Sequence, residues 1–274
     1  MISRVVGLYF SPSGETAKIT KRISAEIAAR MNDVCLDPVT SEFHDLLREP
    51  PAGSVTIGDD AVVIIGMPAY NGRIPSHCAD LIRRIHASGN LAIVVVAYGN
   101  SSYGDALYEL NSFAETQGFR VVSAGAFISQ HPMFERIAEH RPDARDLREL
   151  LRFCEASANK MKRFCGTDFE ELRGRVAPLH IKGQMPAKEP VRTPLHPSAN
   201  GFCIRCGACS AICPVHAIDP TDPARVDPKR CISCTACIRV CEQDARGFYG
   251  PMCAASRLAL ERIYSKRKEP EWFI

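Results

Sequence analysis

The chain has 274 residues, of which 46% are hydrophobic and 24% charged, and its net charge is +3. This composition is ordinary for a globular protein with a core, so it excludes wholesale disorder, and at about 150 residues per domain it favours two domains. Near-neutral charge argues against a nucleic-acid partner. The apolar runs are far shorter than the ~20 residues that span a bilayer, and we see no secretory signal, so we expect a cytoplasmic location and no membrane.

Apolar runs alternate with helical patterns over residues 1–165, which we take as the first domain. Strands are expected at 5–10, within 33–39, and at 61–65, 91–96 and 121–128, and helices at 16–30, 76–88, 104–117 and 143–165. The continuously apolar runs 61–65 and 91–96 are typical of strands that helices cover on both faces. This order predicts an α/β fold with a doubly wound parallel sheet, whose ligands bind beyond the carboxyl ends of its strands.

The loop after the first strand, residues 11–16, offers hydroxyls, a glycine and the free N–H groups of a helix start. Its sequence is Ser11-Pro12-Ser13-Gly14-Glu15-Thr16. Such a loop can bind an anion, although without Lys or Arg it would hold a phosphate by neutral donors alone. It is neither a Walker loop nor a dinucleotide fingerprint. A simple helix cap made of Ser and Thr is the alternative interpretation.

Two more loops follow expected strands and pair tyrosine with glycine and asparagine. They contain Pro68-Ala69-Tyr70-Asn71-Gly72 and Tyr98-Gly99-Asn100, with Tyr103-Gly104 shortly after. A tyrosine ring gives a flat stacking surface, and glycine lets the backbone approach a planar heterocycle.

Residues 3–165 with these loops resemble the flavodoxin-like family. Residues 9–16 are similar to that family's FMN phosphate loop, with Ser13 in place of the commoner Thr. The resemblance implies FMN as a cofactor and a flavodoxin-like sheet. It also implies FMN-binding roles for Ser11, Ser13, Gly14, Glu15, Thr16, Pro68, Ala69, Tyr70, Asn71, Gly72, Tyr98, Gly99, Asn100, Tyr103 and Gly104. His131, after the fifth strand, could approach the flavin; we assign no catalytic residue.

Residues 166–198 are rich in proline, which disfavours helix and central strand. They form either a linker between two modules or an irregular segment packed over one domain. Of the 13 cysteines, Cys35, Cys78, Cys154 and Cys165 are scattered before this stretch, and we interpret them as small buried hydrophobes.

Eight further cysteines form two copies of one pattern, C-x2-C-x2-C-x3-C. Residues 203–213 and 231–241 are identical at six of eleven positions, with an offset of 28 residues. In two-cluster proteins the fourth cysteine of such a run binds the other cluster. We therefore expect Cys203, Cys206, Cys209 and Cys241 to hold one [4Fe-4S] cluster, and Cys231, Cys234, Cys237 and Cys213 to hold the second. Zinc sites need cysteine pairs separated by a longer loop, which this spacing does not provide.

Residues 199–248 resemble a bacterial two-cluster ferredoxin, with Pro214 after Cys213 as in that family. We take 199–250 as a small α+β ferredoxin-like domain and 251–274 as a helical extension. Glu242 replaces the second proline; its charge would lower the potential of a nearby cluster, but we favour a solvated side chain. Arg262, Lys266, Arg267 and Lys268 could dock an acidic partner, although a solvated helix end is the preferred interpretation.

The whole chain resembles a flavodoxin–ferredoxin fusion. We therefore expect an electron-transfer protein that passes electrons between two [4Fe-4S] clusters and FMN, with a ferredoxin or oxidoreductase as redox partner. Each cluster accepts or gives up one electron, whereas FMN accepts or gives up one or two. Such a protein would therefore convert between one-electron and two-electron transfer. An FMN-dependent reductase of a quinone, flavin or nitro compound is one alternative, and a redox or oxygen sensor is another.

Overall fold

The computed structural model describes residues 2–33, 35, 37–164, 171, 175–185 and 193–274. Its main sheet contains β1 (Arg4–Tyr9), β2 (Thr40–Asp45), β4 (Ala61–Pro68), β6 (Leu91–Tyr98), β7 (Arg120–Ile128) and β10 (Glu271–Phe273). The strand order is β10-β7-β6-β4-β1-β2, and all pairs are parallel except β10 with β7. The parallel strands therefore follow the order 2-1-3-4-5 of a flavodoxin-like doubly wound sheet. The predicted α/β fold is confirmed.

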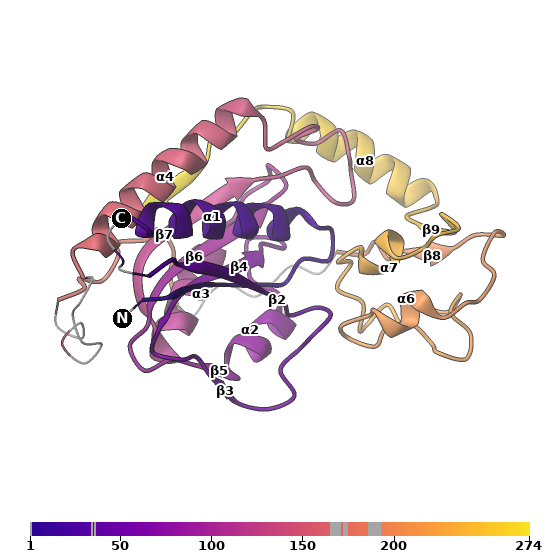
Figure 1. The fold of residues 1–274 in the computed structure, drawn as a ribbon. Coiled ribbons are helices and arrows are strands. Elements are labelled where there is room, and N and C mark those ends of the chain that lie inside the picture. The colour runs from indigo at the N-terminus through magenta and orange to yellow at the C-terminus, as the bar shows by residue number, and fades with distance from the viewer. Residues whose placement is uncertain (1, 34, 36, 165–170, 172–174, 186–192) are drawn as a thin grey trace.

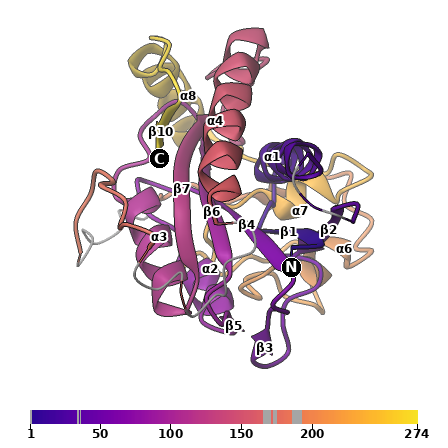
Figure 2. The same cartoon turned by 60° about the vertical axis from the view of Figure 1, so that its left-hand side comes forward.

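Four helices cover the two faces of this sheet, as Figure 2 shows. They are α1 (Glu15–Met31), α2 (Ser76–Ile82), α3 (Ala106–Thr116) and α4 (Ala144–Lys162). Helices α1 and α4 pack together on one face, whereas α2 and α3 lie on the other. Two short strands, β3 (Val55–Thr56) and β5 (Ile85–His86), pair beside the sheet.

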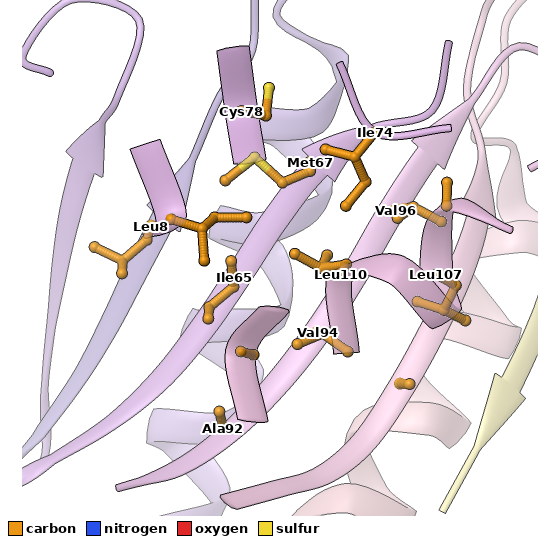
Figure 3. Packing of buried hydrophobic residues seen from close by; sticks show 14 of the residues in the cluster. Leu8, Ile65, Met67, Ile74, Cys78, Ala92, Val94, Val96, Leu107 and Leu110 are labelled. Carbon is orange, nitrogen blue, oxygen red and sulfur yellow. The ribbon is translucent and has the colours of Figure 1, made fainter. Parts of the chain in front are cut away.

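The hydrophobic core is split by the sheet into two layers because successive strand residues point to opposite faces. Figure 3 shows the layer under α2 and α3, to which Ile65, Met67, Val94 and Val96 contribute. The intervening residues of the same strands, such as Ile64, pack under α1 and α4. This double burial explains why β4 and β6 read as unbroken apolar runs.

A second, smaller unit lies beyond the carboxyl ends of the parallel strands (Figure 1). It contains β8 (Ser198–Ala199), α6 (Ala208–Ala211), α7 (Ala236–Arg239) and β9 (Arg246–Gly247). Its buried apolar cluster consists mainly of cysteines, with Ala217 and Ile218. A core this small supplies little burial energy by itself.

After the small unit the chain returns to the sheet. Helix α8 (Pro251–Ile263) is followed by β10, which pairs with β7 in antiparallel register. The expectation of a helical extension over 251–274 is therefore wrong beyond Ile263. The three residues of β10 have little local preference of their own, and pairing with the sheet edge makes them a strand. Cys253, at 3% exposure, packs with Phe134, Ile137 and Leu195 between the two units.

Two other expectations need correction. The second strand lies at Thr40–Asp45, not within 33–39, and its polar sequence reflects an edge position where most side chains reach solvent. The helix expected at 76–88 ends at Ile82, before the short strand β5.

The proline-rich stretch 166–198 is only partly among the described residues. Where described, it packs over the first domain: Ile181 is 7% exposed in the core layer under α2 and α3, and Leu179 packs against that layer. Cys165 lies outside the described residues, whereas Cys78 and Cys154 are fully buried, as expected, and Cys35 is partly buried.

Gly66 is a position where the fold depends on the absence of a side chain. A Cβ there would lie 1.9 Å from Thr20 Oγ1 on α1. We predict that Gly66→Ala lowers the free energy of unfolding by about 1–3 kcal/mol through overpacking. Denaturant unfolding of the full chain checks this. Gly53→Ala is the matched control, since a Cβ at Gly53 meets nothing within 4 Å; equal effects of the two changes would contradict the prediction.

Candidate functional site

The loop 11–16 forms the start of α1 at the carboxyl end of β1. Gly14 adopts a left-handed conformation (φ 88°), and the Ser11 hydroxyl accepts a hydrogen bond from the Ala17 N–H at 2.9 Å. Within the described chain, the N–H groups of Glu15 and Thr16 donate to no acceptor, and the Thr16 side chain is 3% exposed without a hydrogen bond of its own. Unsatisfied donors at the N-terminus of a long helix suit a phosphate. The residues therefore fit the phosphate of FMN, and the helix-cap interpretation accounts for Ser11 alone.

The second loop is a tight turn at the carboxyl end of β4. Tyr70 and Arg73 exchange backbone hydrogen bonds of 2.8 and 3.1 Å, and Asn71 (φ 51°) and Gly72 (φ 79°) occupy the centre. Two positive φ angles define a type I′ turn, which explains the Asn-Gly sequence. The Arg73 guanidinium donates to the buried Glu109 carboxylate at 2.6 Å, so α3 fixes the turn.

The third loop, after β6, is held by the C-terminal segment. The Asn100 amide donates to the carbonyls of Tyr264 and Lys266 at 2.8 and 3.0 Å and accepts from the Lys268 N–H at 3.1 Å. Tyr98 and Tyr103 are 4% and 9% exposed, and their rings pack edge to face. Both rings therefore pack inside the protein, and the FMN-binding roles expected for Tyr98 and Tyr103 stay predictions.

The loops after β4 and β6 meet at two of the predicted residues, Gly72 and Gly104. The Asp105 N–H donates to the Gly72 carbonyl at 2.9 Å, and a Cβ on Gly104 would lie 2.7 Å from Gly72 Cα. Tyr70 is the predicted aromatic residue that stays near the edge of the sheet, partly buried, with Ala69 beside it. It is the side chain that could stack on a flavin ring.

His131 lies against Gly99, where a Cβ would meet its ring at 2.7 Å. Its ring stacks on Phe134, and its Nδ1 accepts from the Met133 and Phe134 N–H groups. Burial lowers the pKa of His131 to about 4, so the ring is neutral at pH 7. His131 is thereby placed at the third loop as a packing residue.

The two cysteine copies fold alike, which shows the duplication in the backbone. Positive φ angles recur at positions 28 residues apart: Arg205 and Ser233, Gly207 and Thr235, and His216 and Asp244. Each left-handed residue at 207 and 235 begins a four-residue helix that carries the third cysteine.

The cysteines gather around two cavities. Cys203, Cys206, Cys209 and Cys241 line one cavity, here called the first cysteine site. Cys213, Cys231, Cys234 and Cys237 line the other, the second cysteine site. Each set combines three cysteines of one copy with the fourth of the other, which is the crossed arrangement expected from the spacing. Among the described residues, no three His, Cys, Asp or Glu side chains are placed to hold a single metal ion.

The surroundings of the cysteines fit a cluster. Burial raises the pKa of Cys234 to about 12 and that of Cys237 to about 11, so their thiolates require a positive charge at the site, which iron supplies. The Thr235 hydroxyl and the Arg246 Nε are buried without a hydrogen-bond partner, and both residues line the second cysteine site. Such orphaned donors suit cluster sulfides and cysteine sulfurs.

Arg246 is a functional residue that sequence reasoning missed. It is 4% exposed, lines both cavities and donates to Cys209 Sγ at 3.6 Å and to the carbonyls of Pro223 and Pro197. No carboxylate pairs with it within the described residues. A buried guanidinium without a carboxylate needs negative charge nearby, and loaded clusters would provide it. The sequence does contain a sign of this role: the duplication aligns Arg246 with Ile218, so a charged residue stands where the first copy has an apolar one.

Glu242 is exposed and lines the first cysteine site, so both interpretations of its charge stay open. Of the basic run, Arg262, Lys266 and Lys268 are exposed, as a solvated run predicts, whereas Arg267 is partly buried. Arg267 forms ion pairs with Asp143 at 2.5 Å and Asp146 at 3.0 Å, and Lys268 Nζ donates to the Ser101 carbonyl. Arg267 and Lys268 thus attach the C-terminal segment to this chain's own first domain.

The second cysteine site and the expected flavin loops meet at the same edge. Arg239, which ends α7 two residues after Cys237, places Nη2 at 3.4 Å from the position of a Cβ on Gly14. Burial, together with the nearby sulfur of Cys234 in its ionised form, raises the pKa of the Tyr70 hydroxyl.

Comparison with protein-family models finds a match in the cysteine-rich unit. A model of the 4Fe-4S dicluster domain matches residues 202–245. No curated protein matches the chain in sequence.

Similar solved structures cover the first domain. They include a flavodoxin from the domain Archaea (17% identity, TM-score 0.39, covering 58% of this chain and 99% of that one). Flavodoxin 1 from Bacillus cereus has 22% identity and a TM-score of 0.40, covering 58% and 98%. An FMN-dependent NADH-azoreductase from Bacillus anthracis has 12% identity and a TM-score of 0.39, covering 58% and 99%.

The dicluster match and the paired cavities define the C-terminal part as an iron–sulfur module for [4Fe-4S] clusters. Together with the 2-1-3-4-5 sheet, the chain combines a flavodoxin-like fold with a 4Fe-4S dicluster domain, the two parts that its sequence predicted. Every helix among the described residues is too short or too polar to span a bilayer.

We predict that Arg246→Gln lowers the reduction potentials of both clusters by roughly 50–100 mV, because a nearby positive charge stabilises the more negative reduced state. Anaerobic redox titration followed by EPR measures the shift. Arg246→Lys, which keeps the charge, should retain most of the wild-type potentials, and Arg230→Gln, at an exposed position, should change neither. Unchanged potentials in Arg246→Gln protein with full iron content would contradict the prediction.

Proposed function

We propose that this protein is a cytoplasmic electron carrier that passes electrons between two [4Fe-4S] clusters and FMN. The observation that carries the proposal is the position of α7: its Cys237 lines the second cysteine site, while its Arg239 reaches Gly14 of the phosphate loop. The cluster bound there would therefore lie beside the flavin. FMN accepts one or two electrons and each cluster one, so the pair would connect one-electron and two-electron reactions.

The chain's own residues would bind and orient the flavin. The N–H groups of Glu15 and Thr16 would hold the phosphate, and the Tyr70–Arg73 turn would present Tyr70 to the ring. The small unit and the C-terminal segment cover the phosphate loop and the third loop. This cover restricts the approach of a small substrate and favours a carrier over the reductase alternative.

A redox partner protein is proposed to exchange electrons at the first cysteine site. Cys206 is exposed there, and its neighbours Phe202 and Ile204 are 76% and 65% exposed. Exposed apolar side chains beside a redox centre offer a docking surface for a transient partner such as a ferredoxin or an oxidoreductase.

Matched cysteine variants test the order of the centres. We expect the cluster at the second cysteine site to supply electrons to the flavin directly. In flash photoreduction of the loaded protein, Cys203→Ser should remove the first cluster yet keep fast electron transfer to the flavin. Cys234→Ser should abolish that fast phase while the EPR signal of the first cluster remains.

Visible absorption for the flavin and EPR for each cluster follow the experiment. Equal rates in the two variants would contradict the proposed order. Steady turnover of a quinone or nitro compound by the chemically reduced wild-type protein would instead establish the reductase function.

A further inference from the structure

The phosphate loop lacks a cation of its own. Residues 11–16 contain one charged side chain, Glu15, and it is paired with Lys18 at 2.6 Å. A phosphate monoester carries a charge between about −1.5 and −2 at pH 7. The loop's backbone donors would therefore hold a strongly anionic group beside a carboxylate.

The small unit supplies the missing charge. Arg239 Nη2 lies 3.4 Å from the position of a Cβ on Gly14, at the centre of the loop. The Arg239 side chain is exposed, and it forms no ion pair or hydrogen bond with the described residues. Its guanidinium is thus available to a ligand, and guanidinium geometry suits phosphate oxygens.

The duplication gives independent support. The position of Arg239 in the first copy is occupied by Ala211, on the helix α6. The two helices share their backbone conformation and the position of their third cysteine. The shared cysteine motif therefore does not require an arginine at this position. The arginine occurs only in the second copy, whose helix α7 faces the phosphate loop.

We propose that Arg239 of the cluster-binding unit binds the phosphate of FMN held by the flavodoxin-like domain. This inference rests on the proposed function, because it needs FMN at the loop. The two units then share one cofactor contact: the arginine closes the phosphate site from the cluster side. Flavin affinity thereby depends on the small unit being folded against the sheet edge.

The test compares FMN with riboflavin, which lacks the phosphate. Full-length protein is freed of flavin, loaded with clusters anaerobically and titrated with each flavin by fluorescence quenching; equal iron content and cluster absorbance verify that the variants fold. We expect Arg239→Gln to weaken FMN binding roughly tenfold and to leave riboflavin binding unchanged. Arg239→Lys should recover part of the loss, and added salt should weaken FMN binding more in wild type than in Arg239→Gln.

Arg230→Gln is the matched control, because Arg230 is also an exposed arginine of the small unit, and it should bind both flavins as wild type does. Unchanged FMN affinity in Arg239→Gln would overturn the inference. So would equal losses for FMN and riboflavin, since the arginine would then act on the ring or the fold. Failure of wild type to bind FMN would overturn the proposed function itself, which is a distinct outcome.

Discussion

The antiparallel pairing of β10 with β7 is the constraint on which the arrangement of the two units depends. The chain leaves the first domain after α4, builds the cysteine-rich unit and then returns to the edge of the same sheet. The small unit is thus tied at both ends. Asn100 strengthens the return, because its amide binds the backbone of residues 264–268. A tether at both ends keeps the small unit at the carboxyl edge, where ligands of such sheets bind.

Charge is distributed between the units in a complementary way. Two arginines of the cluster-binding unit face anion sites: Arg246 lies buried between the cysteine sites, and Arg239 faces the phosphate loop. The buried position of Arg246 demands a negative partner that the described residues do not supply, and the exposed Arg239 is free to bind one. The four-cysteine clusters and a flavin phosphate are anions of the required kind. Cofactor loading would therefore satisfy the protein's electrostatics as well as supply its redox chemistry.

The sequence predicted the fold where local signals and burial agree. The runs 61–65 and 91–96 mark strands buried on both faces, and the repeated cysteine spacing marks the two crossed sets of ligands. It misplaced β2, because an edge strand is polar, and it missed β10, because three residues carry no periodicity. Tyr98 and Tyr103 looked like stacking residues, yet their rings pack in the core: Tyr98 ends β6 on the face under α2 and α3, and Tyr103 packs against it from the following loop.

The sequence by itself determined the chemistry of this protein. Cysteine spacing, a duplicated motif and a hydroxyl-rich loop are local patterns, and such patterns can be recognised without knowledge of the fold. Only the tertiary structure decided which groups from different units meet: Arg239 lies more than two hundred residues along the chain from Gly14, and Asn100 is held by residues near the C-terminus. Such contacts depend on how the chain returns on itself, and no periodicity or spacing in the sequence encodes that path.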